Sequence, residues 1–144
     1  MSSKILANDS RHGHAVMEFA LFLPFLLFTF VGVFDWGNYS WALMKTEGAA
    51  RLAALYTSSS SSTATDSTGA CTYALAELSD ASNIAGKTAC TSPLTVTAAA
   101  VTGPDGNNAS QVTVSYQTVA LIPIPGLLPG QMTITRAVTM MLRS

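Results

Sequence analysis

Hydrophobic positions follow two different patterns along the chain. Residues 19–34 form an uninterrupted run of 16 uncharged residues, and after Asp35 the chain is again free of charge up to Lys45. Beyond residue 93, short runs instead alternate apolar with polar positions. A continuous apolar run approaching about 20 residues is typical of a helix that spans a bilayer, whereas alternation with a period of two is typical of a half-buried strand. The pattern therefore predicts a membrane anchor followed by a small, more polar domain.

The predicted anchor continues as one helix over residues 14–56. Its last part, residues 42–56, is rich in Ala, Leu, Met, Lys, Glu and Arg, which favour helix. We expect half of this helix to lie in lipid and half outside. The outer interface is then marked by an aromatic belt formed by Trp36, Tyr39 and Trp41.

A cleaved secretory signal is the main alternative to a retained anchor. Such a signal has an apolar core of about 7–15 residues that leads directly into a cleavage site of small residues. Here the run is longer, and Asp35 and Trp36 stand where the small residues should be. The polar leader carries Lys4 and Arg11 against Asp9, so the positive-inside rule predicts a cytoplasmic N-terminus and a translocated domain.

Small residues recur four positions apart near the end of the predicted helix. Ala49 is followed by Ala53, and Ala50 by Ala54. This spacing lets another backbone approach closely. Two interpretations are open at this stage, namely contact with a helix of another subunit and packing against the chain's own domain.

The remaining residues predict a small domain after a linker. Ten of the twelve residues 57–68 are Ser or Thr, so residues 57–69 are expected to form a flexible linker; a glycosylated stalk has no further support. A short helix is predicted over residues 70–82. Strands are predicted, by their alternation, over residues 94–101, 110–121 and 131–142.

The connections between these strands have different characters. Residues 103–108, GPDGNN, are a strong turn signal, whereas residues 122–130, IPIPGLLPG, contain three prolines and are expected to form an oily loop. We therefore predict an α+β fold, in which a short helix covers one face of a three-stranded antiparallel sheet within residues 70–144.

Composition removes several classes of function. Charged residues make up 10% of the chain, against about 25% in an average soluble domain, and the net charge is -1. There is no basic patch to attract nucleic acid, so no nucleic-acid partner is expected.

The two cysteines, Cys71 and Cys90, both follow the apolar run. They are interpreted as free core thiols, as part of a metal site or as a disulfide. No histidine lies near them, which argues against zinc, and the polar surroundings favour a disulfide formed in an oxidising compartment. Closing this loop stabilises a domain by about 3 kcal/mol in the chain-entropy model.

Catalytic motifs are absent from the sequence. His12 and His14 precede the apolar run, and there is no phosphate-binding loop or nucleophile set. Asp105, Asn107 and Asn108 only faintly resemble a calcium loop, and a plain hairpin turn is favoured. We expect no catalytic residue, no metal and no cofactor.

Glu18 raises the most specific question, because it directly precedes the apolar run, where a carboxylate is costly. It lies five residues after Gly13 and is followed by Phe19 and, inside the run, by Pro24. This arrangement resembles the type IV prepilin processing signal, in which a membrane aspartyl peptidase cuts after the glycine and the fifth residue of the mature chain is glutamate.

The resemblance extends over residues 13–56. GHAVMEFALFLPFLLFTFVGVFDWG and the later EGAARLAALY resemble the start of TadE-like minor pilins of the tight-adherence (Flp, type IVc) pilus system. Met17 stands where that family often has valine. The resemblance implies removal of the leader, residues 1–13, and His14 as the new terminus. It also implies assembly contacts through Glu18, Phe19 and Pro24.

The function implied is that of a minor pilin or pseudopilin, a structural subunit of a Tad-type pilus or related filament. Expected partners are other pilins, the prepilin peptidase, the assembly platform of the bacterial inner membrane and lipid. The domain is then expected in the periplasm, or on the cell surface in a pilus. Two alternatives stay open: Glu18 only marks the interfacial end of the helix, or the chain is a membrane-anchored periplasmic binding domain with a ligand near residues 122–130.

Overall fold

The computed structural model describes residues 9–119, 122 and 130–143. The chain divides into two compact units, Met1–Gly37 and Asn38–Ser144. Helix α1, Asp9–Thr57, contributes residues to both units, and the other elements belong to the second. They are α2, Ser67–Glu77, and the strands β1, Leu94–Thr102, β2, Asn108–Gln117, and β3, Thr133–Met141. The predicted α+β class, with a long helix, a short helix and a three-stranded antiparallel sheet, is confirmed.

The first unit is the apolar half of α1. Large apolar side chains along it are exposed on all sides, and from Val16 onward the helix is long and apolar enough to cross a membrane. Pro24 lies inside the helix. Proline has no backbone N–H, so the carbonyl of Ala20 lacks its usual helical donor. One turn later the Thr29 hydroxyl donates to the carbonyl of Phe25 at 2.9 Å.

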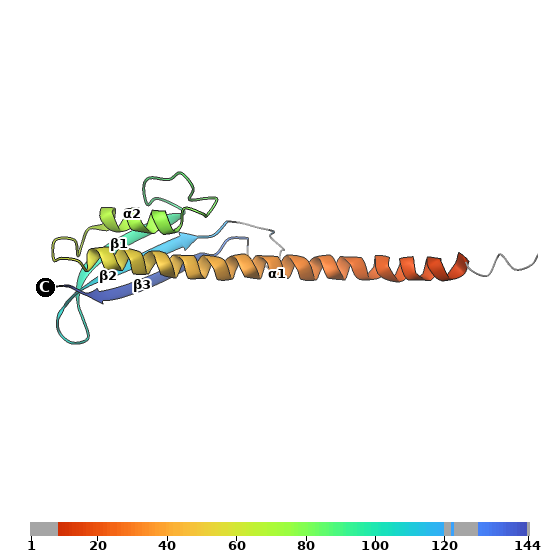
Figure 1. The fold of residues 1–144 in the computed structure, drawn as a ribbon, viewed down its shortest axis with the longest axis horizontal. Coiled ribbons are helices and arrows are strands. Elements are labelled where there is room, and N and C mark those ends of the chain that lie inside the picture. Colours follow the sequence, from red (N-terminus) through yellow and green to blue (C-terminus); the bar gives the residue numbers. More distant parts are fainter. Residues whose placement is uncertain (1–8, 120–121, 123–129, 144) are drawn as a thin grey trace, which may run out of the picture. The chain divides into compact units, whose positions relative to one another are not determined.

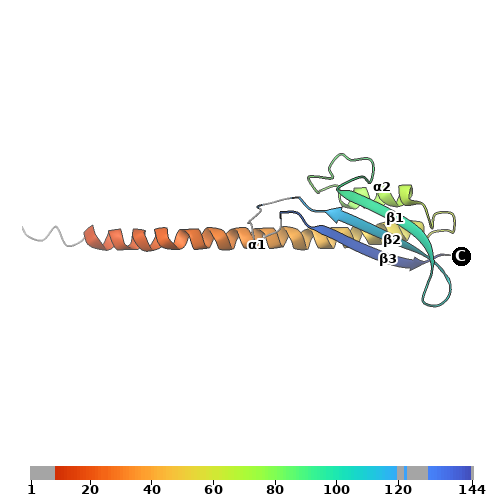
Figure 2. The ribbon, with the colours of Figure 1, turned by 180° about the vertical axis from the view of Figure 1, so that it is seen from behind.

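The sheet of the second unit has the order β1-β2-β3, with antiparallel neighbours throughout. Figures 1 and 2 show α2 and the second half of α1 on the same face of this sheet. The predicted alternation holds on β2, where Val112, Val114 and Tyr116 are buried on the helix-facing side. Burial raises the pKa of the Tyr116 phenol, whose hydroxyl donates to Asn83 Oδ1 at 2.8 Å.

The second half of α1 packs on the core through small residues. Ala49, Ala50, Ala53 and Ala54 are all 0% exposed and belong to the core cluster of this unit. The four-residue spacing of alanines is therefore used by the chain's own domain. Alanine lets the helix backbone lie close to its neighbours without rotamer entropy to lose.

The three residues of the expected aromatic belt differ in burial. Trp36 is exposed, but Tyr39 and Trp41 are half-buried and pack against the core of the second unit. The second unit begins at Asn38, within the residues expected to form the membrane helix and its outer continuation, and it includes both of these rings.

The Ser/Thr-rich segment differs from a flexible linker. Residues 58–65 form turns, and Ala64 is buried. The Ser110 hydroxyl of β2 lies 2.8 Å from Thr57 Oγ1 and 2.9 Å from the carbonyl of Ala64. The N–H of Arg143 donates to the carbonyl of Ser58 at 2.9 Å. Short hydroxyl side chains satisfy one another and the backbone here, which composition alone does not reveal.

Helix α2 begins at Ser67, three residues before the predicted start, because Asp66 caps it. The Asp66 carboxylate accepts hydrogen bonds from the N–H groups of Thr68 and Gly69 at 3.1 and 3.0 Å. Such a side-chain acceptor satisfies donors that the first helical turn leaves free.

The predicted hairpin between β1 and β2 is present. The N–H of Gly103 donates to the carbonyl of Asn107 at 2.8 Å, and Gly106 has a φ of +79° that favours glycine. Asp105, Asn107 and Asn108 are exposed in or beside this turn. Most of the predicted oily loop, residues 122–130, lies outside the described residues, and Ile122 is exposed.

Candidate functional site

The residues singled out in the sequence for processing and assembly all lie on the first part of α1. Gly13 and His14 fall inside this helix, and the His14 side chain is exposed. Glu18 directly precedes the uncharged run and Asp35 directly follows it. At about 1.5 Å of rise per residue, the two carboxylates are roughly 25 Å apart along the axis. That length is slightly less than the hydrocarbon core of a typical bilayer, about 30 Å.

Glu18 is an exposed carboxylate without a local partner. Within the part of the chain that the structure describes, it makes no hydrogen bond and no ion pair. Its neighbour Phe19 is 62% exposed. The side chains at the start of the run are therefore available to a second molecule, whether lipid or protein.

Asp35 differs from Glu18 in its surroundings. Its Oδ1 atom is buried and has no hydrogen-bond partner among the described residues. The sequence indicated only that this carboxylate stands at the far end of the run.

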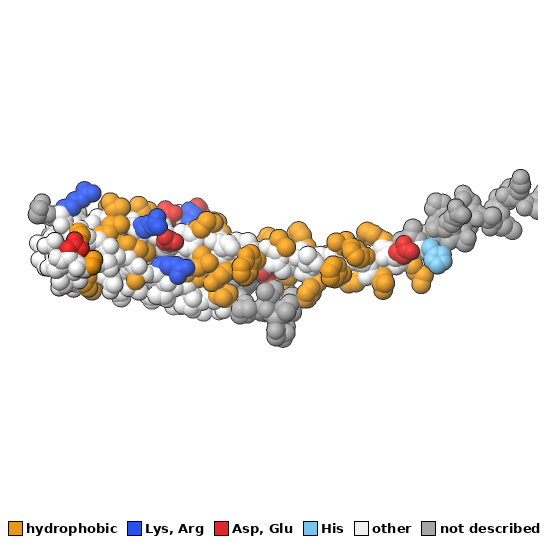
Figure 3. Space-filling model, turned by 90° about the horizontal axis from the view of Figure 1, so that it is seen from below, with side chains coloured by type: hydrophobic (Ala, Val, Ile, Leu, Met, Phe, Trp, Pro, Cys, Tyr) orange, Lys and Arg blue, Asp and Glu red, His pale blue; other side chains and the backbone are white. Residues whose placement is uncertain are grey.

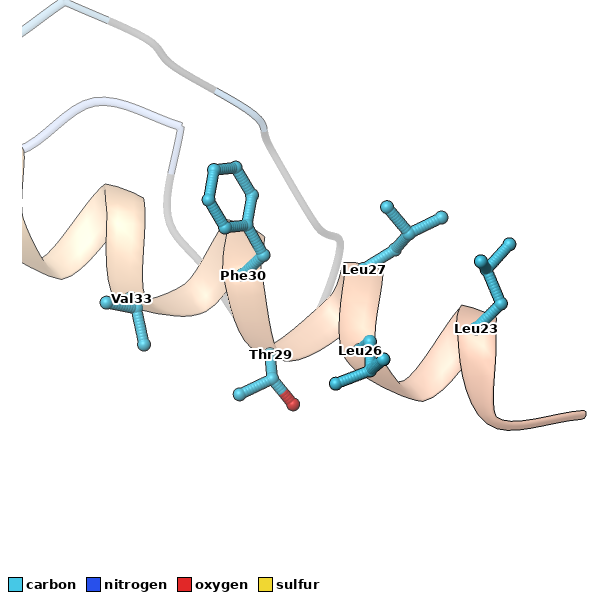
Figure 4. Close-up of a pocket in the computed structure, with 6 residues that line it drawn as sticks. All are labelled: Leu23, Leu26, Leu27, Thr29, Phe30 and Val33. Atoms are coloured by element: carbon cyan, nitrogen blue, oxygen red, sulfur yellow. The ribbon is translucent and has the colours of Figure 1, made fainter. Parts of the chain in front are cut away.

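Between the two carboxylates, one side of α1 carries a shallow apolar depression. Figure 4 shows the side chains that line it as they leave the helix, and nearly all of them are hydrocarbon. The single hydroxyl, that of Thr29, already donates to the backbone of its own helix. The depression therefore offers an apolar surface to a lipid chain or another helix and no specific polar contact. It is lined by Leu23, Leu26, Leu27, Thr29, Phe30 and Val33.

Figure 3 shows how the side-chain types are distributed. On the face drawn there, hydrophobic side chains recur along the first unit, and the Lys and Arg side chains lie on the second unit. Lys45 lies 3.4 Å from Glu77 Oε1 and 3.3 Å from Asp80 Oδ2, so it joins the end of α2 to α1. Arg51 pairs with Glu47 on the same helix. These pairs are structural contacts on the exposed side of the domain.

A second contact between the helices surrounds Tyr56. Its hydroxyl donates to Asp66 Oδ2 at 2.7 Å, and its ring stacks on Tyr73 with centroids 4.9 Å apart. The hydrogen bond from the N–H of Gly69 and, as the next largest cause, the hydrogen bond from the hydroxyl of Tyr56 lower the pKa of the Asp66 carboxyl from its usual value. Sequence reasoning missed this contact, although Asp66 is a residue type that favours the N-cap position of a helix.

Cys71 and Cys90 are joined in a disulfide, with their Cα atoms 5.7 Å apart. The bond connects α2 to the segment before β1. Of the three interpretations that the sequence left open, the structure selects the disulfide. Among the described residues, no group of three or more His, Cys, Asp or Glu side chains is arranged to hold a metal ion.

The comparisons with known proteins concern the N-terminal part. Residues 13–55 match the family model described as TadE-like protein. No curated protein and no solved structure matches the chain. The match ends inside α1, so it includes the apolar helix but not α2 or the sheet. The TadE-like family is a structural, pilus-associated family rather than an enzymatic one. Residues 13–55, which include the apolar helix, are therefore similar to the TadE-like family, and this likeness fits a pilin-like protein associated with Tad pilus systems.

Proposed function

We propose that the chain is a minor pilin or pseudopilin, a structural subunit that takes part in the assembly of a Tad-type pilus or related filament. The observation that carries the proposal is Glu18. It is an exposed carboxylate with no partner in the described part of the chain, it lies at the start of an uncharged helical run, and it belongs to the TadE-like segment. A charge at this position is costly in lipid, so a role in binding accounts for it.

Processing supplies the partner that Glu18 needs. In this proposal, a prepilin peptidase cuts between Gly13 and His14 and releases residues 1–13. The cut creates an α-amine on His14, and such amines have a pKa of about 7.7–8.0 in peptides, so the group is largely cationic at neutral pH. The amine of one subunit then pairs with Glu18 of its neighbour as the helices come together.

Pairing makes the carboxylate an indicator of assembly. An isolated ion in lipid is strongly penalised, whereas two opposite charges in contact remove much of each other's penalty. The exposed ring of Phe19 and the apolar surface around Pro24 support the contact by adding area between helices. The disulfide domain lies on the outer side of the membrane in this arrangement, where an oxidising compartment maintains the Cys71–Cys90 bond.

The membrane-anchored binding domain remains a formal alternative without a specific observation in its favour. Its proposed ligand region, residues 122–130, lies mostly outside the described residues.

The proposal is tested by replacing Glu18 with glutamine, which keeps the shape and removes the charge. We expect Glu18→Gln to be produced, inserted and cut to a His14 terminus, as mass spectrometry of the membrane-extracted protein would show. Its co-purification with other pilins should fall at least about tenfold. Removing one member of a buried pair costs roughly 3–5 kcal/mol, and a third of that is already a factor of ten.

The matched control is Glu47→Gln, which neutralises a carboxylate on the exposed part of the same helix. This variant should co-purify like the wild type. Equal co-purification of Glu18→Gln and the wild type would contradict the assembly role, and an intact Met1 terminus in membrane-extracted wild type would contradict the processing step.

A further inference from the structure

The two outer strands of the sheet differ in whether other parts of the described chain cover their free edges. In an antiparallel sheet, alternate residues of an outer strand direct their N–H and C=O groups away from the sheet. On β1 these are the even-numbered residues. The odd-numbered Pro93 and Gly103, at the two ends of the strand, hydrogen-bond to Gln117 and Asn107 instead. On β3 they are the odd-numbered residues, because Leu142 bonds to Asn108.

The free edge of β1 is covered. Helix α2 lies along this strand, and the Ser67 hydroxyl at its start accepts a hydrogen bond from the outward N–H of Ala98 at 2.9 Å. The outward N–H of Leu94 donates to the carbonyl of Thr91 at 3.2 Å. Covering an outer strand with a helix is one of the ways in which proteins prevent unwanted strand pairing.

The free edge of β3 is not covered. Its outward-directed residues are Thr133, Thr135, Ala137, Thr139 and Met141, all exposed. Within the described part of the chain, no hydrogen bond satisfies their outward N–H groups, and no helix or strand lies along this side (Figure 2). Only beyond the strand, at Arg143, does an outward N–H find a partner, the carbonyl of Ser58.

Apart from one charged side chain on its helix side, strand β3 lacks the usual features that block pairing. It is nine residues long, contains no proline, and pairs with β2 in an uninterrupted register without a bulge. Its one charged residue is Arg136. An edge of this length and regularity is a template for another strand.

Arg136 indicates what that strand carries. It occupies a helix-side position of β3, yet it is exposed, and among the described residues its guanidinium makes a single hydrogen bond, a 3.4 Å contact to the carbonyl of Thr135. No carboxylate pairs with it among the described residues. Because its own N–H points toward β2, Arg136 would face an added strand at a non-hydrogen-bonded position, where opposite side chains come closest.

We propose that the free edge of β3 pairs with an extended, antiparallel strand of a partner subunit that places a carboxylate side chain opposite Arg136. A second copy of this chain is a poorer occupant in the registers that pair most of both strands. Pairing two β3 strands about Ala137 sets their Arg136 residues diagonally opposite, and pairing about Arg136 sets them directly opposite, and like charges at such positions are destabilising. The site is separate from the α1 contact and does not depend on it.

The test uses the full chain in detergent micelles and a defined probe. The probe is a capped nine-residue peptide of alternating threonine and valine with glutamate at its centre, and the comparison peptide has lysine there. Hydrogen exchange of the outward amides of Thr133, Thr135, Ala137 and Thr139 is followed as peptide is added. We expect the glutamate peptide to slow exchange and to bind about two- to fivefold more tightly than the lysine peptide. In Arg136→Glu the order of the two peptides should reverse.

Backbone pairing is tested separately from charge. Ala137→Pro removes an outward N–H without breaking the ladder to β2, because proline is tolerated where the strand faces solvent. It should abolish the effect of the peptide while the amides of Ile134, Val138 and Met140 stay protected. The matched control, Ala100→Pro, makes the same change on the outward side of β1 and should leave binding unchanged.

Three results would overturn the proposal. They are no slowing with either peptide, equal slowing in Ala137→Pro and wild type, and equal affinity of the wild type for both peptides. Slowing that grows with protein concentration in the absence of peptide would assign the edge to a second copy instead. Glu18→Gln should bind the peptide like wild type, which keeps this test distinct from that of the helix contact.

Discussion

Single residues in the domain perform more than one structural task. Asp66 caps α2 with one oxygen and accepts the Tyr56 hydroxyl with the other. This double contact requires the Tyr56 ring to pass directly beside the backbone of Gly69. A Cβ atom at Gly69 would stand 2.3 Å from Cε1 of Tyr56 and 2.4 Å from its hydroxyl oxygen. The glycine is therefore needed for close approach rather than for an unusual backbone angle.

Gly69→Ala should for this reason destabilise the domain. The ring must leave its position, which weakens both the stack on Tyr73 and the bond to Asp66. Overpacking of this kind costs typically about 1–3 kcal/mol, partly offset by the higher helix propensity of alanine. Unfolding by urea, followed by near-UV circular dichroism of the full chain in micelles, measures the change.

Gly37→Ala provides the comparison, because nothing lies within 4 Å of a Cβ atom there. Its unfolding midpoint should stay at or slightly above that of the wild type. A Gly69→Ala midpoint equal to that of Gly37→Ala would contradict the close-approach argument.

At the scale of elements, α1 has a fully buried alanine face and a free face with larger residues. Leu52 and Leu55 are 42% and 50% exposed, whereas Ala49, Ala50, Ala53 and Ala54 are completely buried. The usual expectation that large apolar residues mark the buried side of a helix fails here. At these four alanine positions the helix lies too close to its neighbours for a larger side chain.

On this helix, enlarging a buried alanine should therefore cost more stability than truncating an exposed leucine. Ala53→Leu adds three carbons at a site without space and should cost about 1–3 kcal/mol. Leu52→Ala removes the same atoms from the exposed side and should change the free energy of unfolding by less than about 0.5–1 kcal/mol. Urea midpoints of the two variants, compared with wild type, check the order; a larger loss for Leu52→Ala would show that the assignment of faces is wrong.

The sequence predicts repeating patterns well and single contacts poorly. The apolar run, the two-residue alternation of Val112, Val114 and Tyr116, and the turn at residues 103–108 depend on local chemistry, and each is present as predicted. The start of α2 was hidden because Asp66 stands within a run of Ser and Thr that reads as linker. The Ser110–Thr57 and Lys45–Asp80 contacts join residues 53 and 35 positions apart, and no periodicity records such pairs.

At the scale of the whole molecule, the second unit is held together by covalent and polar ties as well as by its core. The disulfide has a sequence separation of 19 residues and fixes α2 to the segment before β1. The second unit has few large buried side chains, and much of its core is alanine. A core of small side chains buries little area per residue, so the disulfide supplies a large share of the stability.

Reduction of the bond should lower the free energy of unfolding by about 3 kcal/mol. The Cys71→Ser, Cys90→Ser double variant should show the same loss without reductant, and adding dithiothreitol should shift the wild type but not the variant. Urea unfolding of all four samples gives the comparison. Identical urea midpoints for oxidised and reduced wild type would mean that the disulfide does not stabilise the fold.

The tie between the last residues of the sheet and the end of α1 has a mechanical consequence. The backbone bond from Arg143 to Ser58 and the cluster around the Ser110 hydroxyl attach β3 and β2 to the same turn at which α1 ends. A pull along α1 is therefore carried to β2 and β3 by these hydrogen bonds as well as by the buried alanine face of the helix.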